Sequence, residues 1–197
     1  MTSAPEPFAR FAALFDRARE SGVPEPTAVA LATSGADGKP SARMVLLKDF
    51  DAGGFTFYTN LGSRKAREIG ETGVAALCFH WQPLEAQVRI EGKVEPVEDE
   101  EADAYFASRP RGNQLGAWAS RQSEPLGSLE ELRRRVAEAD TRFAGGDVPR
   151  PPFWSGFRVV PERIEFWHGR PDRLHERELY LRDRDAPGGW KVERLYP

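Results

Sequence analysis

The sequence predicts an antiparallel β-barrel that carries peripheral helices. Short runs of alternating apolar and polar residues fill much of the chain, and turns separate them, in keeping with its 18 glycines and 16 prolines. Apolar residues at helical spacing gather near the start and in the middle. At 197 residues, of which 40% are hydrophobic, the chain can bury one core, so we expect a single domain over 1–197 that begins with a short arm and helix over about 1–22.

The first part of the chain predicts one helix and then strands. Helical spacing ends before Gly22, so we expect an amphipathic helix whose buried face is formed by Phe8, Phe11, Ala12, Leu14, Phe15 and Ala18. Strand patterns follow over 27–33, 41–48 and 55–59, and the short turns between them predict a three-stranded meander. A helix over 63–70 and a strand over 74–79 come next, and then a long strand with Ala86, Val88 and Ile90 on one face.

The middle of the chain predicts helices and the last part predicts strands. Acidic residues open a helix over 99–108, which the segment Arg109-Pro110-Arg111 should end. After a polar loop over 120–125, Ser128 and Glu131 have the spacing of a capping box that opens a helix to about residue 143. Beyond a Pro-rich link we expect strands over 156–160, 163–167, about 178–182 and 190–195.

Composition excludes several classes of protein. The 28 Lys and Arg residues against 31 Asp and Glu give a net charge of -3, which argues against broad nucleic-acid binding. Cys78 is the single cysteine and cannot form an internal disulfide, and His80, His168 and His175 lack metal-ligand spacing, so we expect no metal. Because the chain shows no secretory signal and no run of 18 apolar residues, we expect a cytoplasmic protein without a membrane partner. Motifs of serine hydrolases, P-loop proteins and Rossmann folds are absent from the sequence.

The segment 173–177 carries the most informative local pattern. In an extended segment, Arg173, His175 and Arg177 share one face, where they would meet the same ligand. Guanidinium groups suit phosphates and flat polar rings, so this face is a candidate anion site. A solvated strand face with chance spacing is the alternative interpretation.

Two other segments could hold a phosphate. Arg64 and Lys65 follow Ser63 at a predicted helix start, where free N–H groups and two cations form a phosphate cradle. Tyr105 and Arg109 share one helix face and could bind a phosphate through a phenol and a guanidinium. An exposed Tyr–Arg stack explains the second pair equally well.

Two further patterns can be explained without a ligand. Arg43 and Lys48 bracket a mostly apolar strand, and charges that reach solvent at strand ends explain them without a ligand. Trp167 lies at the end of a predicted strand, where it is either a core residue or the wall of a site for a flat ring.

Together these segments resemble the pyridoxine/pyridoxamine 5'-phosphate oxidase family, which are FMN-dependent enzymes with a split-barrel fold. The resemblance runs from about Pro26 to Pro197. It is carried, in order, by residues 43–48, 57–65, 105–111, 114–118, 122–123, 153–158, 165–167, 173–177 and 194–197. The resemblance implies a mainly β fold, an antiparallel split β-barrel that binds FMN and carries peripheral helices.

The resemblance also implies site residues, position by position. The implied FMN contacts are Arg43, Met44, Val45, Leu46, Leu47, Lys48, Tyr58, Thr59, Arg64, Lys65, Gln87, Gln122, Ser123, Trp167 and Arg177. The implied substrate contacts are Lys48, Tyr105, Arg109 and Asn113 around the phosphate, and Arg173, Leu174 and His175 near the pyridine ring, with Arg173 and His175 as the catalytic pair. Asn113 replaces the family's phosphate-binding Ser, and its amide can still donate. A homodimer is implied, because in the family FMN lies at a two-fold interface.

The implied reaction oxidises the C4' carbon of pyridoxamine or pyridoxine 5'-phosphate with O2, giving pyridoxal 5'-phosphate and hydrogen peroxide. Which member of the catalytic pair acts as base stays open. Family members usually carry a longer N-terminal arm that covers the substrate, whereas Met1 to Pro7 precede the first helix here, so a lid is expected to be missing or supplied otherwise. Two alternatives remain: a phenazine-pathway oxidase of the same fold, and a non-catalytic flavin or pyridoxal phosphate carrier.

Overall fold

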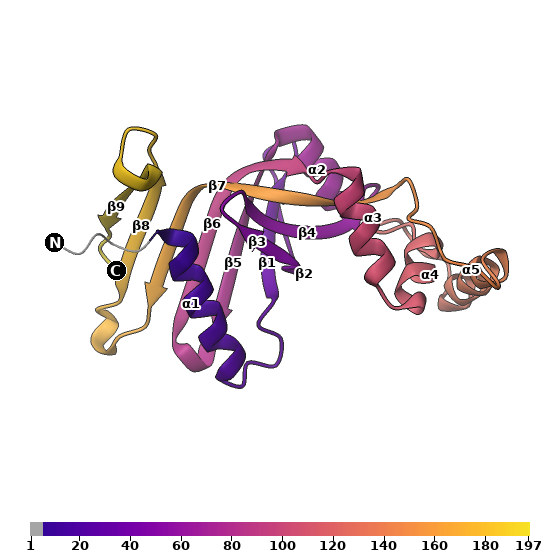
Figure 1. Cartoon of the computed structure of the whole chain (residues 1–197), viewed down its shortest axis with the longest axis horizontal. Coiled ribbons are helices and arrows are strands. Elements are labelled where there is room, and N and C mark those ends of the chain that lie inside the picture. Colours follow the sequence, from indigo (N-terminus) through magenta and orange to yellow (C-terminus); the bar gives the residue numbers. More distant parts are fainter. Residues whose placement is uncertain (1–5) are drawn as a thin grey trace.

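Nine antiparallel strands form one curled sheet in the computed structural model, which describes residues 6–197 (Figure 1). The strands are β1 (Ala28–Ser34), β2 (Pro40–Leu46), β3 (Asp49–Asp51), β4 (Gly54–Asn60), β5 (Val74–Trp81), β6 (Ala86–Pro96), β7 (Trp154–His168), β8 (Glu176–Arg182) and β9 (Trp190–Arg194). Their order is β2-β1-β5-β6-β7-β4-β3, and β8 pairs with β7 and β9. The predicted barrel-like antiparallel sheet is therefore confirmed.

Three of the five α-helices in the described chain lie together at one end of the molecule (Figure 1). The helices are α1 (Pro7–Glu20), α2 (Arg64–Thr72), α3 (Asp99–Ser108), α4 (Arg111–Ala119) and α5 (Leu129–Arg142), with short 3-10 turns η1 (Gln82–Leu84), η2 (Pro171–Arg173) and η3 (Pro187–Gly189). Helices α3, α4 and α5 lie at one end of the molecule, and β8, β9 and the C-terminus lie at the other (Figure 1). No helix within residues 6–197 is both long and apolar enough to cross a membrane.

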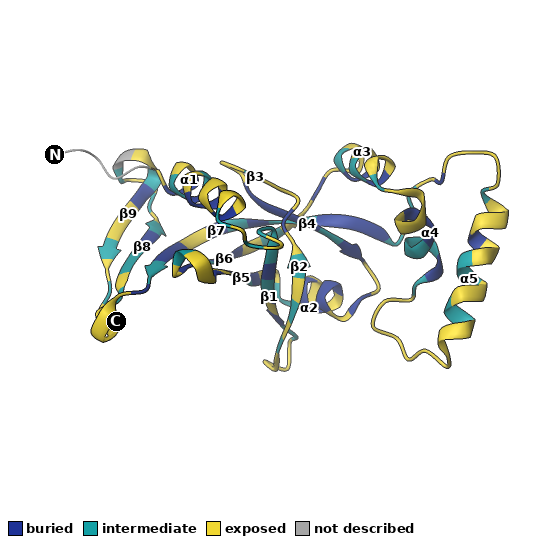
Figure 2. Ribbon diagram, turned by 90° about the horizontal axis from the view of Figure 1, so that it is seen from below, coloured by how far each residue is buried: buried dark blue, intermediate teal, exposed yellow. Residues whose placement is uncertain are grey.

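Helix α1 covers the core face of the sheet, as its apolar spacing predicts. Phe11 is fully buried, and its ring centroid lies 4.9 Å from that of Phe55 in β4 and 5.2 Å from that of Phe79 in β5. Burial also dominates β4, which Figure 2 shows as a nearly continuous dark blue ribbon. The same buried strand reaches the helical end of the molecule, so it carries the core toward the site described below.

The predicted three-stranded meander is wrong. Strands β1 and β2 form a hairpin, but β4 pairs with β3 and β7, at the far end of the strand order. Alternation of apolar residues identifies a strand without naming its partner, and the turn before Gly54 serves the β3–β4 hairpin. The chain between β2 and β3 links the two borders, because Leu47 N–H donates to Thr27 O and Lys48 N–H donates to Thr56 O.

Strand β7 is continuous, whereas the sequence predicted two strands over 156–160 and 163–167. It pairs with β4 through its first residues, with β8 through its last, and with β6 along nearly its whole length. Pro161 does not end it, because the register shifts between Glu91 and Gly92 on the facing strand. A Cβ on Gly92 would lie 2.0 Å from the carbonyl oxygen of Val160, so the close approach requires glycine.

Helix α4 was not predicted. Arg109-Pro110-Arg111 ends α3 as expected, but Pro110 is also the N-cap of α4, which starts at the next residue. Proline disrupts a helix interior yet is tolerated at its start, where its missing N–H leaves nothing unpaired. The other predicted helices are confirmed, including the Ser128 cap, whose hydroxyl accepts from Glu131 N–H.

Candidate functional site

A cleft of about 900 Å³ opens between β2, β4 and α2 on one side and α3 and α4 on the other. Its lining carries five cationic side chains, namely Arg43, Lys48, Arg64, Lys65 and Arg109. Among the lining residues, all of which the structure describes, there is no Asp or Glu. A cleft with this charge suits ligands that carry phosphate or other anionic groups.

The cleft brings together most of the predicted site residues. They are Arg43, Met44, Val45, Leu46, Lys48, Tyr58, Thr59, Arg64, Lys65, Tyr105, Arg109, Asn113, Gln122 and Ser123. Leu47 lies in the same segment but is buried in the core, because it alternates with its neighbours. The sequence did not single out Trp154, or Gly112, Gly116 and Ala117 of the unpredicted α4, which also line the cleft.

One end of the cleft is built on the first turn of α2. The hydroxyl of Ser63 caps this helix, and Lys65 Nζ donates to Thr59 Oγ1 at 3.1 Å and to Gln122 Oε1 at 3.0 Å. The backbone N–H of Arg64 donates to Ser123 Oγ at 3.1 Å. Burial, with the charge of Arg43, lowers the pKa of Lys65. This α2 end therefore concentrates N–H donors and cations, as the phosphate-cradle prediction requires.

An aromatic stack forms the other end of the cleft. The Tyr58 ring stacks with Tyr105, at 4.0 Å, and with Trp154, at 5.3 Å between centroids, and the Tyr105 and Trp154 centroids lie 6.1 Å apart. Tyr58 Oη donates to Glu101 at 3.1 Å, and burial together with that carboxylate raises the pKa of Tyr58. The Arg109 guanidinium lies 4.8 Å above the Trp154 ring. Tyr105 and Arg109 thus share a fixed aromatic platform.

Arg109 lacks a partner that its position demands. Its Nη1 atom is buried and forms no hydrogen bond within the described part of the chain. Burial lowers the pKa of this guanidinium, yet arginine stays protonated at neutral pH. A buried, unpaired cationic donor is costly, so an anion in the cleft would complete its contacts.

The remaining predicted residues lie elsewhere, on β6, β7 and β8 and in the turn that precedes β8. Gln87 pairs with Trp167, and Trp167 pairs with Arg177, so the three form one row across neighbouring strands. The His175 ring lies 4.7 Å from that of Trp167. None of these residues, nor Arg173 or Leu174, lines the cleft of the same chain. We call Gln87, Trp167, Arg173, Leu174, His175 and Arg177 the outer row.

The extended face predicted for 173–177 is wrong. Arg173 ends the turn η2, where Asp172 and Arg173 have φ of 57° and 62°, and β8 begins only at Glu176. Of Arg173, His175 and Arg177, only Arg177 therefore lies on a strand, and the three side chains do not share one strand face. The Arg177 guanidinium binds the buried Glu165 carboxylate through two bonds, of 2.7 and 3.1 Å, and Arg89 reaches the same carboxylate at 3.0 Å.

His175 has one ring nitrogen already engaged. Its Nδ1 atom accepts the backbone N–H of Arg170 at 3.2 Å. An acceptor carries no proton, so a neutral His175 in this arrangement has its proton on Nε2. The free side of the ring is consequently a hydrogen-bond donor.

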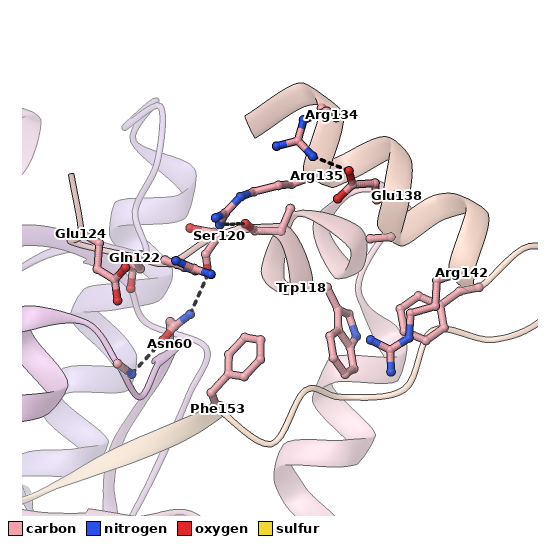
Figure 3. A pocket seen from close by; sticks show the side chains of 15 residues that line it. Asn60, Trp118, Ser120, Gln122, Glu124, Arg134, Arg135, Glu138, Arg142 and Phe153 are labelled. Atoms are coloured by element: carbon pink, nitrogen blue, oxygen red, sulfur yellow. Dashed lines mark hydrogen bonds and ion pairs between the residues drawn. The ribbon is translucent and has the colours of Figure 1, made fainter. Parts of the chain in front are cut away.

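A second hollow, of about 650 Å³, lies beside the cleft between α4 and α5 (Figure 3). It shares Asn60, Ser120 and Gln122 with the cleft, and Asn60 Nδ2 donates to Ser120 O at 3.1 Å. Trp118 and Phe153 project into it in Figure 3. The sequence did not predict this hollow, since α4 itself was missed. Within residues 6–197, no group of three His, Cys, Asp or Glu side chains is arranged to hold a metal.

Solved structures define the class of protein. The chain aligns over its full length with PhzG from Burkholderia lata 383, determined in complex with tetrahydrophenazine-1-carboxylic acid, at 36% identity and a TM-score of 0.92, covering 95% of that chain. A pyridoxamine 5'-phosphate oxidase-related, FMN binding protein from Nostoc punctiforme aligns at 19% identity and a TM-score of 0.76, with both chains fully covered, which shows the fold. This protein therefore has the split-barrel fold of these structures.

Sequence comparisons give the family. Residues 15–143 match the model of the pyridoxamine 5'-phosphate oxidase family, and residues 154–197 match that of the pyridoxine 5'-phosphate oxidase C-terminal dimerisation region. A pyridoxine/pyridoxamine 5'-phosphate oxidase of Myxococcus xanthus is 61% identical, covering 98% of this chain and 92% of the relative. One from Rubrobacter xylanophilus is 58% identical, with coverages of 98% and 88%. The chain belongs to the pyridoxamine 5'-phosphate oxidase family.

Proposed function

We propose that this protein is an FMN-dependent oxidase that converts pyridoxamine 5'-phosphate or pyridoxine 5'-phosphate to pyridoxal 5'-phosphate. Oxygen is the electron acceptor and hydrogen peroxide the second product. The observation that carries the proposal is the cleft itself, with five cations and no carboxylate in its described lining. Two phosphorylated ligands held together, a flavin and a pyridine, explain why the cations form groups at both ends. Relatives named for this activity, at 61% and 58% identity, support it.

The α2 end fits the phosphate of FMN. Arg64 N–H already donates to Ser123 Oγ there, and Lys65 Nζ donates to Gln122 Oε1. Arg43 and the strand that follows it would line the rest of the flavin. When bound, FMN supplies the two-electron redox chemistry that links oxidation at C4' to reduction of O2.

The aromatic end fits the phosphate of the substrate. The unpaired Arg109 Nη1, the Tyr105 hydroxyl, the Lys48 ammonium and the Asn113 amide all line this part of the cleft. A phosphate bound by these donors fixes the pyridine ring at a set distance from the other end of the cleft. Holding both ligands in this way replaces a random encounter with an aligned geometry.

The outer row would complete the cleft of a second subunit, so we propose a homodimer. Gln87, Trp167 and Arg177 do not line the cleft of their own chain, and Trp167 and Arg177 lie in the segment that matches a dimerisation region. In the partner's cleft, Trp167 and Arg177 would contact the flavin, while Arg173 and His175 would face the pyridine. The cytoplasmic location and the single-domain organisation stay predictions.

Arg173 and His175 would act by orientation. An arginine does not readily release its proton, and a neutral His175 with its Nδ1 atom occupied presents Nε2–H toward the ligand. Both side chains then donate hydrogen bonds to the substrate's ring and C4' substituent. We therefore assign neither of them as the base.

The test uses the purified protein loaded with FMN. Under air, pyridoxamine 5'-phosphate should yield pyridoxal 5'-phosphate and peroxide in equal amounts. Without oxygen, the same substrate should bleach the flavin once and then stop. A protein that binds FMN but is not bleached by this substrate would contradict the proposal.

A second candidate keeps the flavin and changes the substrate. The 36% identical PhzG structure contains tetrahydrophenazine-1-carboxylic acid, and this chain has Asn113 where a phosphate-binding Ser is expected. Oxidation of a reduced tricyclic acid, without turnover of either vitamin B6 phosphate, would favour this candidate. The higher identity to the vitamin B6 phosphate oxidases ranks it second.

A further inference from the structure

Glu68 is a buried carboxylate on α2 that lies directly behind the cleft. Its side chain is 9% exposed and is not part of the cleft lining. Within residues 6–197, it is the only carboxylate that forms an ion pair with a cation of that lining. Nothing in the sequence singles out Glu68, because its partners come from three separate elements.

The contacts of Glu68 converge from β1, β2 and α2. Its Oε2 atom accepts from Thr33 Oγ1 at 2.5 Å, from Ser41 Oγ at 2.6 Å and from Arg43 Nη2 at 3.3 Å. Its Oε1 atom accepts from Arg64 Nε at 2.7 Å. Arg43 also donates to the oxygens of Thr33 and Ser41, whose own O–H groups donate to Glu68. Two hydroxyls and two guanidiniums therefore donate hydrogen bonds to one carboxylate.

Electrostatics keep this carboxylate ionised. Burial would raise the pKa of Glu68, but hydrogen bonds from Ser41, Thr33 and Arg64, with the charge of Arg64, lower it to about 2. Glu68 is therefore negatively charged throughout the physiological pH range. It lies beside Arg43 and Arg64 and about one helical turn from Lys65. Three cations and one carboxylate leave a charge of about +2, which matches a phosphate dianion.

Resting on the proposed function, we infer that Glu68 is the positioning residue for the FMN phosphate. It holds the Arg64 side chain through its one hydrogen bond in the described structure, and it fixes the Arg43 guanidinium beside it. The cations are then set in place before the ligand arrives, so less side-chain freedom is lost on binding. Glu68 itself does not touch the ligand.

The experiment compares FMN with riboflavin, which is the same ring system without the phosphate. Glu68→Gln should weaken FMN binding about tenfold, equivalent to one lost charge-assisted hydrogen bond, while riboflavin affinity stays within about twofold. If charge alone mattered, removing a carboxylate would tighten FMN binding. Unchanged or tighter FMN binding, or equal losses for both flavins, would overturn the inference.

Two more variants guard the result. Glu71→Gln lies on the same helix but accepts from Ala36 N–H at the surface, so it should leave both affinities unchanged. Thr33→Val removes one donor to Glu68 while keeping the β-branched shape, and should give a smaller loss for FMN only, even if Glu68→Gln fails to fold. A protein that binds neither flavin before substitution would refute the proposed function. A strong preference for FMN over riboflavin that survives both Glu68→Gln and Thr33→Val would refute only the role of Glu68.

Discussion

The cleft and the outer row differ in how completely one chain builds them. Around the α2 end of the cleft, side chains such as Lys65 and Arg43 bond to several partners in their own chain. In the outer row, Leu174 is 69% exposed and Arg173 lies in a turn and has left-handed backbone. The α2 end is organised before any ligand binds, whereas Arg173 and Leu174 lie exposed at the surface. The proposed homodimer accounts for this difference, because in it a single chain would supply two halves of two different sites.

The largest effect is expected at Arg109, where the cleft has an unpaired buried donor. Arg109→Ala should lower kcat/KM for pyridoxamine 5'-phosphate about a hundredfold, because a charge-assisted contact to phosphate is lost. FMN content should stay the same, since we propose that the flavin phosphate binds at the other end. Steady-state kinetics with absorbance spectra measure both. Arg111→Ala, which removes an ion pair with Asp140 outside the cleft, is the matched control and should change neither.

Mixing subunits tests whether the two regions belong to different sites. Arg109→Ala damages the cleft and Arg177→Ala damages the outer row, so each homodimer should be nearly inactive. Coexpressed with separate tags, random pairs should recover about one quarter of the unsubstituted activity, because half of the dimers then carry one intact site.

The control pair places both changes in the cleft. Arg109→Ala mixed with Lys65→Ala leaves no intact cleft in any dimer, so activity should not return. Equal recovery in both mixtures would contradict the division into two regions. No recovery in either mixture would mean that cleft and outer row act within one chain.

A pair of substitutions at His175 tests its role as a donor. The amide N–H₂ of Gln reaches about as far as histidine Nε2, whereas the amide of Asn ends near Nδ1. His175→Gln should therefore retain kcat/KM about tenfold better than His175→Asn, the value of one hydrogen bond to a charged or strongly polar group. FMN affinity should be equal in the two variants. The reverse ranking would mean that the occupied Nδ1 side matters, and that the donor assignment is wrong.

The last expected effect is on stability at the α2 end, and it depends on pH. The folded pKa of Glu68, about 2, lies below its ordinary value of 4.5, so its ionisation stabilises the fold above pH 4.5. That contribution, at most about 3 kcal/mol, is lost as pH falls from 4.5 toward 2. Denaturant unfolding of the flavin-free protein should show a gap between unsubstituted and Glu68→Gln protein at pH 7 that narrows at pH 3.5. A gap independent of pH would show that packing, not charge, dominates.

Local patterns in the sequence predicted most elements and failed where distant segments decide the outcome. The apolar spacing of Phe8, Phe11 and Phe15 is enough to predict α1, because all three residues lie on one face of the same helix. Strand pairing is different, since nothing within β4 says that it lies between β3 and β7. The continuity of β7 through Pro161 depends on Gly92, which is remote in sequence.

The same reasoning separates the predicted from the unpredicted parts of the site. The cradle at Arg64 and Lys65 is a local motif, so the helix start was enough to predict it. Helical spacing had already paired Arg109 with Tyr105 as a candidate phosphate site, whereas only the resemblance gave Arg43 a ligand, because the contacts of Arg43 are not local. Glu68 and Trp154 escaped both approaches, since their importance arises only from side chains that the fold gathers around them.

The length of strand β7 separates the cleft from the outer row within one chain. Trp154, under the aromatic end of the cleft, is its first residue, and Trp167 of the outer row is its second-last. An extended chain rises about 3.3 Å per residue, so the two tryptophans lie roughly 40 Å apart along an unbent strand, too far for one small ligand to contact both. Bringing them together in one chain would require breaking the strand at the centre of the sheet. Dilution into monomers should therefore abolish turnover even where every chain remains folded.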